Sequence, residues 1–212
     1  MPKLATPAAP AAWMTEEAIE DTKRAASSGS SFFQTSKMEP KKPYRMRCVG
    51  VGITGWVGWT NAKKPHRLAT KPAPEQYHPD IQTADGEPYK HFVATIVYVY
   101  ETDEFKVLEM TQKMLINPLM KCIQNPEYGQ PTDFDITIEK EGSGKEGTKY
   151  TLIPSPPKPL AKAIASRFAE TDVDMQALFR DGDPLNPGGA KSAADPVDDD
   201  EDEEDEEDGD DD

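Results

Sequence analysis

The sequence predicts an all-β core with one or more short helices, in a single domain with disordered termini. Two observations lead to this fold class. Segments rich in β-branched and aromatic residues, or alternating between apolar and polar residues, recur between residues 44 and 153, as is typical of strands. Only 36% of the 212 residues are hydrophobic and 20 are proline, which leaves material for one modest core of about 100 to 130 residues.

Five segments are predicted to be strands. The densest in β-branched and aromatic residues is His91–Tyr100, and Glu101–Glu104 would turn it into a hairpin with Phe105–Thr111. The other three are Tyr44–Val51, Phe134–Glu139 and Thr148–Ile153. In Phe134–Glu139, Phe and Ile alternate with acidic residues and Thr, which predicts that the acids face solvent. Gly142–Gly147 is predicted to be a mobile hairpin loop.

The segment Gly52–Lys90 is predicted to be a long connection, because it is rich in Gly, Pro and Lys. A connection of this length is unusual in a compact domain, so it is expected to be either functional or partly disordered.

The hydrophobic period changes to that of a helix in Gln112–Gln124. Leu115, Leu119, Cys122 and Ile123 fall on one face of that helix, and Pro118 is expected to kink or interrupt it. Leu160–Phe168 and Val173–Phe179 are predicted to be short amphipathic helices.

The composition divides the chain into four regions. Residues 1–31 form a flexible segment, in which Thr15–Arg24 is a possible short helix; residues 32–160 form the folded domain. Residues 161–180 form a short helical segment, and residues 181–212 a disordered tail that buries no apolar surface.

The net charge of −15 is a property of the tail. Asp195–Asp212 contains 15 acidic residues and no basic ones, so the rest of the chain has equal numbers of acids and bases. Such a tail is a solubility or partner-binding segment, or a polyanion that competes for a basic groove in the same chain; the sequence leaves these roles open.

Positive charge is concentrated between Lys37 and Lys71, where nine Lys or Arg residues accompany one acid, Glu39. Phe32, Phe33, Tyr44, Trp56 and Trp59 lie in or next to this segment. Cations that follow the phosphates, together with aromatic rings that stack on bases, suit single-stranded nucleic acid bound without sequence preference. In the alternative interpretation, the tryptophans belong to the core and the lysines form a solvated face.

Other classes of function find little support. The glycines of residues 50–58 lack a complete dinucleotide-binding pattern, and no nucleophile–histidine arrangement stands out, so we do not expect an enzyme. Cys48 and Cys122 form no CxxC pair, and we expect no metal or other cofactor. We expect His66, His78 and His91 to be surface or hydrogen-bonded residues. No apolar run is long enough to span a bilayer and no leader is recognisable, so a soluble intracellular protein is expected.

Several segments, in order and spacing, resemble phage-encoded single-stranded-DNA-binding proteins. They are KPYRMRCVGVGITGWVGWT, KKPHR, HFVATIVYVY, FKVLEMTQKML, EYGQPTDFDITIEKEGSG and TKYTLIPSPPKPL, followed by the acidic tail. The resemblance covers about Phe32–Leu160 and, in character, the tail.

The resemblance implies an OB-fold, a five-stranded Greek-key barrel with a helix between its third and fourth strands. It also implies that the protein coats and protects DNA strands exposed in phage replication, recombination and repair, in the cytoplasm of the infected host cell. The tail would recruit replication and recombination proteins. Some relatives hold a structural zinc on a Cys/His cluster or end in an aromatic tip that docks into partners; this sequence supplies neither.

The sequence and the resemblance together give one set of candidate DNA contacts. It contains Tyr44, Arg45, Arg47, Trp56, Trp59, Lys63, Lys64, Arg67 and Lys71, with Tyr98, Tyr100 and Lys149 as further candidates. The alternatives are an acidic-tailed protein-interaction or histone-like adaptor without preference for single strands, and an RNA-binding cold-shock-like barrel. The oligomeric state is left open.

Overall fold

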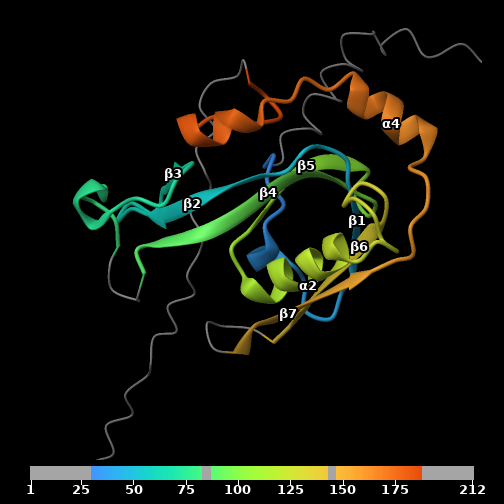
Figure 1. Cartoon of the computed structure of the whole chain (residues 1–212), viewed down its shortest axis with the longest axis horizontal. Coiled ribbons are helices and arrows are strands. Elements are labelled where there is room, and N and C mark those ends of the chain that lie inside the picture. The colour runs from blue at the N-terminus through green and yellow to red at the C-terminus, as the bar shows by residue number, and fades with distance from the viewer. Residues whose placement is uncertain (1–29, 83–86, 143–146, 188–212) are drawn as a thin grey trace, which may run out of the picture. The chain divides into compact units, whose positions relative to one another are not determined.

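The computed structural model of the chain describes residues 30–82, 87–142 and 147–187 (Figure 1). Its elements all lie in the unit Ser31–Asp212, which separates from Met1–Ser30. The predicted helix Thr15–Arg24, most of the predicted flexible segment, the centre of the Gly142–Gly147 loop and the acidic tail lie outside the described residues.

Within these ranges the chain forms a mainly antiparallel sheet of seven strands. The strands are β1 (Tyr44–Cys48), β2 (Ile53–Trp59), β3 (Pro65–Leu68), β4 (Tyr89–Val99), β5 (Glu104–Met110), β6 (Asp135–Glu141) and β7 (Lys149–Pro154). Their order is β3-β2-β4-β1-β6-β7, and β5 pairs with the other edge of β4. The sheet is open, because among the described residues no pairing joins β5 to β7.

Strand β4 connects the two halves of the sheet. Its residues 89–94 pair with β2, residues 97–99 pair with β1, and residues 93–99 pair with β5 on the opposite edge. Consequently β2, β3 and residues 89–94 of β4 form a three-stranded extension, which projects beyond β1, β6 and β7 (Figure 1).

All five predicted strands are present, with bounds that differ by a few residues. The prediction of a long connection over Gly52–Lys90 was wrong, because β2, β3 and the one-turn helix η2 (Pro74–Gln76) lie within it. The glycines that suggested a loop are required by packing. A Cβ on Gly55 would lie 2.6 Å from the Leu68 carbonyl and 2.7 Å from the Phe92 ring, and one on Gly58 would lie 2.9 Å from the Ile81 side chain.

One face of the sheet packs on helix α2 (Lys113–Gln124) and on the one-turn helix η1 (Thr35–Lys37), and there the larger hydrophobic core forms. Leu115, Leu119 and Cys122, which the sequence pattern places on one helical face, are buried, and Ile123 packs against this core. The helix runs through Pro118 without the predicted interruption. Its buried apolar face compensates for the hydrogen bond that proline cannot donate.

The other face packs on the carboxyl-terminal segment, which contains α4 (Lys162–Ala169) and the 3-10 helix η3 (Met175–Arg180). These helices lie on the opposite side of β4 and β5 from α2 (Figure 1). The prediction that residues 181–212 bury no apolar surface was wrong for the first residues of that segment. Asp183 is 8% exposed and accepts a hydrogen bond from the Ser31 hydroxyl, and Leu185 packs on this second core.

Candidate nucleic-acid interface

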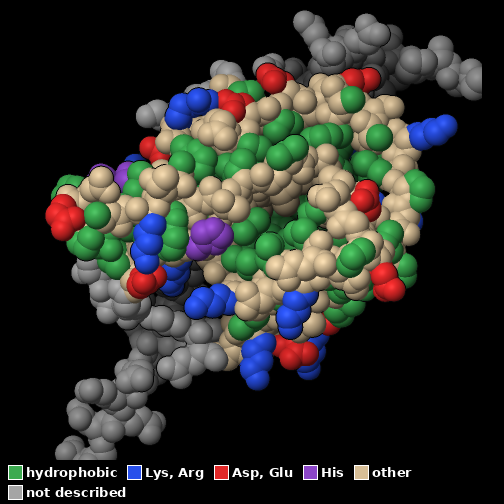
Figure 2. Space-filling model, in the orientation of Figure 1, with side chains coloured by type: hydrophobic (Ala, Val, Ile, Leu, Met, Phe, Trp, Pro, Cys, Tyr) green, Lys and Arg blue, Asp and Glu red, His purple; other side chains and the backbone are tan. Residues whose placement is uncertain are grey.

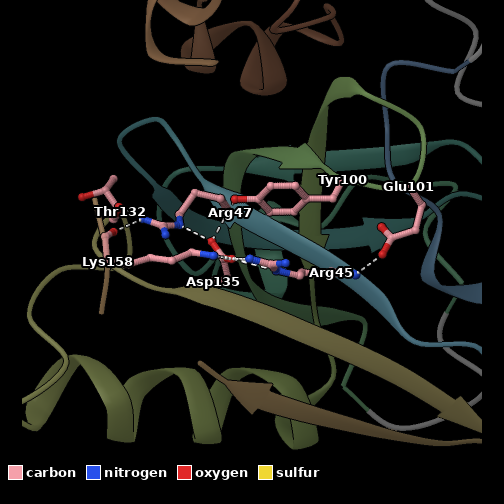
Figure 3. Close-up of polar contacts among 7 residues, drawn as sticks. All are labelled: Arg45, Arg47, Tyr100, Glu101, Thr132, Asp135 and Lys158. Carbon is pink, nitrogen blue, oxygen red and sulfur yellow. Dashed lines mark hydrogen bonds and ion pairs between the residues drawn. The ribbon is translucent and has the colours of Figure 1, made fainter. Parts of the chain in front are cut away.

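Some of the predicted site residues fall into two separate regions, and the first surrounds Asp135 of β6. Arg45 and Arg47 lie on the same face of β1, and both guanidinium groups contact the Asp135 carboxylate. Arg45 Nε donates to Asp135 Oδ2 at 2.7 Å, and Lys158 Nζ lies 2.9 Å from the same oxygen. The Tyr100 hydroxyl donates to Oδ1 at 3.1 Å (Figure 3). We call these five residues the Asp135 cluster.

The alternating pattern predicts Asp135 on the solvent face, but its side chain is fully buried. The reason is cross-strand pairing: Asp135 lies directly opposite Arg47, whose long side chain covers it together with those of Arg45 and Lys158. Arg47 is also fully buried, and its Nη1 donates to the carbonyls of Thr132 at 2.9 Å and Lys158 at 3.0 Å. The alternating pattern of the β6 sequence therefore gave no indication of the internal Arg47–Asp135 ion pair.

The electrostatics of the cluster follow from this geometry. Burial alone would raise the pKa of Asp135, but hydrogen bonds from Lys158, Arg47 and Arg45 outweigh it and lower that pKa to about 2. Burial, and then the neighbouring Asp135 charge, raise the pKa of Tyr100. The Arg45 guanidinium lies 4.5 Å from the centre of the Tyr100 ring, a cation–π distance.

Two of the predicted phosphate contacts are structural in this fold. Arg47 cannot reach a phosphate because its side chain is 0% exposed. Arg67 is nearly buried, and its Nε donates to Glu109 Oε2 on β5 at 2.8 Å. We therefore remove Arg47 and Arg67 from the proposed contacts.

The second region is one face of the extension, centred on Trp56. In the register of β3, β2 and β4, Leu68, Trp56 and His91 lie directly opposite one another and share that face. The rings of Trp56 and His91 meet edge to face, with centroids 5.5 Å apart. Lys71 Nζ lies 4.9 Å from the centre of the Trp56 ring. We call Trp56, Leu68, Lys71 and His91 the Trp56 face.

The Trp56 face is accessible to solvent. Trp56 and Leu68 are half-buried, whereas His91 and Lys71 are exposed. Lys71 pairs with Glu87 at 3.2 Å, but both side chains are at least half exposed, so solvent screens this ion pair. Figure 2 shows apolar side chains gathered on the displayed side of the molecule, with a histidine and several Lys or Arg side chains beside them.

Trp59 does not lie on the Trp56 face. Three residues after Trp56 on the same strand, it points to the opposite face, where it lies across from Pro65 at the end of the extension. Lys63 and Lys64 form the turn from β2 to β3, and the backbone N–H of Lys64 donates to the Thr60 hydroxyl. The two tryptophans therefore cannot form one stacking surface.

The remaining candidates lie elsewhere. Tyr98 is 7% exposed; its hydroxyl donates to Asp103, and the Arg167 guanidinium of α4 lies 5.8 Å from its ring centre. Tyr44 packs edge to face on Phe33, and Lys149 is exposed at the start of β7.

Sequence reasoning missed His91 and Lys158. His91 becomes significant only through the β2–β4 register, which could not be inferred while β2 was assigned to a loop. Lys158 follows a proline-rich segment, and only the fold brings it to Asp135. The other two histidines also make contacts: His66 Nδ1 lies 2.9 Å from the Tyr89 hydroxyl, and burial, followed by the charge of His78, lowers the pKa of His66.

Among the described residues, no three His, Cys, Asp or Glu side chains gather as a set of metal ligands. None of the helices in that part of the chain is long and apolar enough to cross a bilayer. No family model matches the chain, and neither the curated proteins nor the solved structures give a match.

Proposed function

We propose that this protein binds single-stranded DNA without sequence preference and is not an enzyme. The observation that carries the proposal is the Trp56 face, where a half-buried indole lies on an open strand surface with a lysine ammonium 4.9 Å from its ring. An indole can stack on any base, and a stacked base contributes about 1 to 3 kcal/mol to binding. This gives affinity without readout of sequence.

The cations near the Trp56 face supply the attraction for phosphates. Lys71 pairs with Glu87 where solvent screens the ion pair, and Lys64 at the β2–β3 turn is exposed. Both can therefore bind phosphates of a strand whose bases stack on Trp56. In a duplex, the faces of the bases are covered by neighbouring base pairs except at the two ends. The Trp56 face therefore favours single strands, whose bases are free to stack on the indole.

The chain order of the elements supports an OB-fold. In this proposal β1 and β2 together form the first barrel strand, β4 and β5 the second and third, α2 the intervening helix, and β6 and β7 the last two strands. The β1–β6 pairing agrees with the Greek-key order of that barrel. The sheet remains open between β5 and β7 within the described residues. The proposed likeness to an OB-fold therefore concerns the order and pairing of the strands, and not the closure of a barrel.

The biological role proposed is the one that the resemblance implies. The protein would coat and protect single strands during phage replication, recombination and repair in the infected cell. Its acidic tail would recruit replication and recombination proteins, and would compete with DNA for the exposed lysines, since 15 negative charges are tethered to the same chain.

Titration of intrinsic tryptophan fluorescence with single-stranded and duplex oligonucleotides at several salt concentrations tests the proposal. We expect preference for single strands and, for about four neutralised phosphates, a slope of log affinity against log salt near −3. No binding to single strands, or equal binding to duplex and single strands, would leave the protein-interaction or histone-like adaptor as the better interpretation. Tighter binding to RNA than to DNA would favour the cold-shock-like alternative.

A further inference from the structure

The Asp135 cluster contains more positive than negative charge. Three cations, Arg45, Arg47 and Lys158, contact the single carboxylate of Asp135. A further acid, Glu101, accepts the backbone N–H of Arg45 on its carboxylate at 2.8 Å (Figure 3). Even when Glu101 is included, the group retains one net positive charge, and Arg47 is buried where water cannot screen it.

The cluster also has more hydrogen-bond donors than acceptors. Arg47 Nη2 is buried and has no partner among the described residues. Arg45 uses Nε and Nη2 on Asp135 Oδ2, while the structure gives its Nη1 no hydrogen bond within the described ranges. Lys158 has three N–H donors, and one oxygen of Asp135 is its ion-pair partner in the same part of the chain.

The head groups that retain donors are adjacent and accessible. Arg45 and Lys158 approach the same oxygen, Asp135 Oδ2, from opposite directions, and their side chains are 43% and 45% exposed (Figure 3). Asp135 holds both heads in place, and the Tyr100 ring supports the guanidinium plane of Arg45. Two cations fixed by a buried carboxylate present their remaining donors to solvent together.

We infer that Arg45 and Lys158 form a binding site for one phosphate group. A tetrahedral phosphate supplies the missing negative charge and can accept from the guanidinium fork and the ammonium at once. The site deepens the proposed function, on which its biological role rests: the phosphate would be a phosphodiester of the bound strand. A free phosphate or a terminal phosphomonoester has the same recognition chemistry, and the experiment distinguishes these sources.

The test is side-chain NMR of the full chain labelled with 15N, in which the Arg45 Nε and Lys158 Nζ signals are followed during titration. The probes are inorganic phosphate, and oligothymidylate with and without a 5′-phosphate. We expect inorganic phosphate to shift both signals, and Lys158→Gln to weaken phosphate binding about tenfold, whereas Lys158→Arg retains it. The matched control is Lys42→Gln, since Lys42 is also 45% exposed and paired with a carboxylate, Glu39.

The outcomes separate the site from the proposed function. Shifts with inorganic phosphate but none with either oligonucleotide would establish a free-phosphate site and contradict its role on the strand, whatever the Trp56 face does. Shifts that require the 5′-phosphate would assign the site to strand ends. If inorganic phosphate at millimolar concentration moves neither signal in the folded wild-type protein, or if Lys42→Gln weakens binding as much as Lys158→Gln, the phosphate site is refuted. Thermal unfolding of each variant shows whether it is folded. If Lys158→Gln proves to be unfolded, the binding of phosphate by Lys158→Arg decides the test.

Discussion

The Asp135 cluster and the Trp56 face each place a cation over an aromatic ring, yet the two regions are built differently. Arg45 lies 4.5 Å from the Tyr100 ring centre, and Lys71 lies 4.9 Å from that of Trp56. In the cluster, a buried carboxylate binds the cations; at the Trp56 face, the partner of Lys71 is an exposed glutamate.

This difference shows that local charge density does not measure the capacity to bind a polyanion. Arg47 and Arg67 belong to the most basic segment of the chain, but the fold places each beside an acid from another part of the sequence. Those acids, Asp135 and Glu109, are 88 and 42 positions away. In the proposed function, only cations whose own side chains remain exposed, such as Lys71, Arg45 and Lys158, can reach a phosphate.

The largest expected effect is on stability, from Asp135→Asn. Removing the carboxylate leaves Arg47 as an uncompensated buried cation, so we expect the free energy of unfolding to fall by about 3 kcal/mol or more. Urea denaturation measures it. Asp103→Asn is the matched control, because Asp103 also binds an arginine, Arg167, but at the surface, and little change is expected there. Equal losses in the two variants would mean that burial of the Arg47–Asp135 pair is unimportant.

Lowering the pH should reproduce part of the loss of stability expected for Asp135→Asn. The pKa of Asp135 is about 2 in the folded protein, below its ordinary value of 3.8, so its contribution to stability is complete above about pH 4. The contribution is lost as the pH falls toward about 2. Urea denaturation at a series of pH values should show a steeper acid loss in the wild type than in Asp135→Asn. Parallel pH profiles would contradict the assignment to Asp135.

Trp56→Ala and Trp59→Ala should separate the two tryptophans. Loss of one stacked base weakens binding by about 5- to 150-fold, and we expect this for Trp56→Ala, measured by fluorescence anisotropy of a labelled oligothymidylate. Trp59 lies on the opposite face, so its variant should bind much more nearly like the wild type. Circular dichroism checks that both are folded. A larger loss from Trp59→Ala would move the interface to the other side of the extension.

The smallest expected effect is that of Lys71→Gln. If Lys71 contacts one phosphate, the slope of log affinity against log salt should become shallower by about 0.7. Lys162→Gln is the control, because Lys162 is an exposed lysine on α4, which packs on the opposite side of the sheet. An unchanged slope for Lys71→Gln would restrict the Trp56 face to stacking.

Much of the fold could be predicted from local pattern. His91–Tyr100 is dense in β-branched and aromatic residues, and the helical period of residues 112–124 puts Leu115 and Leu119 on one face, which the structure buries. Strand β2 was missed because Gly55 and Gly58 lower strand propensity, and the reason for them is non-local: Phe92 and Ile81 occupy the space of their side chains.

The site was harder to predict than the fold. Segment 37–71 contains both the open and the internal cations, and nothing within it distinguishes Lys71 from Arg67. The distinction depends on contacts between distant strands: register places Arg47 opposite Asp135 and His91 opposite Trp56, and packing brings Arg67 to Glu109. Register between strands distant in sequence follows from tertiary packing, so it could not be read from one sequence.

The most direct test of the central claim is 19F NMR of the full chain carrying 5-fluorotryptophan, with its three signals assigned by Trp→Phe variants. Addition of oligothymidylate should shift the Trp56 signal most strongly, because a base stacks on that ring, and the shift should saturate with the same midpoint as binding measured by anisotropy. If the strand binds while the Trp56 signal stays in place and that of Trp13 or Trp59 moves instead, the Trp56 face is not the interface.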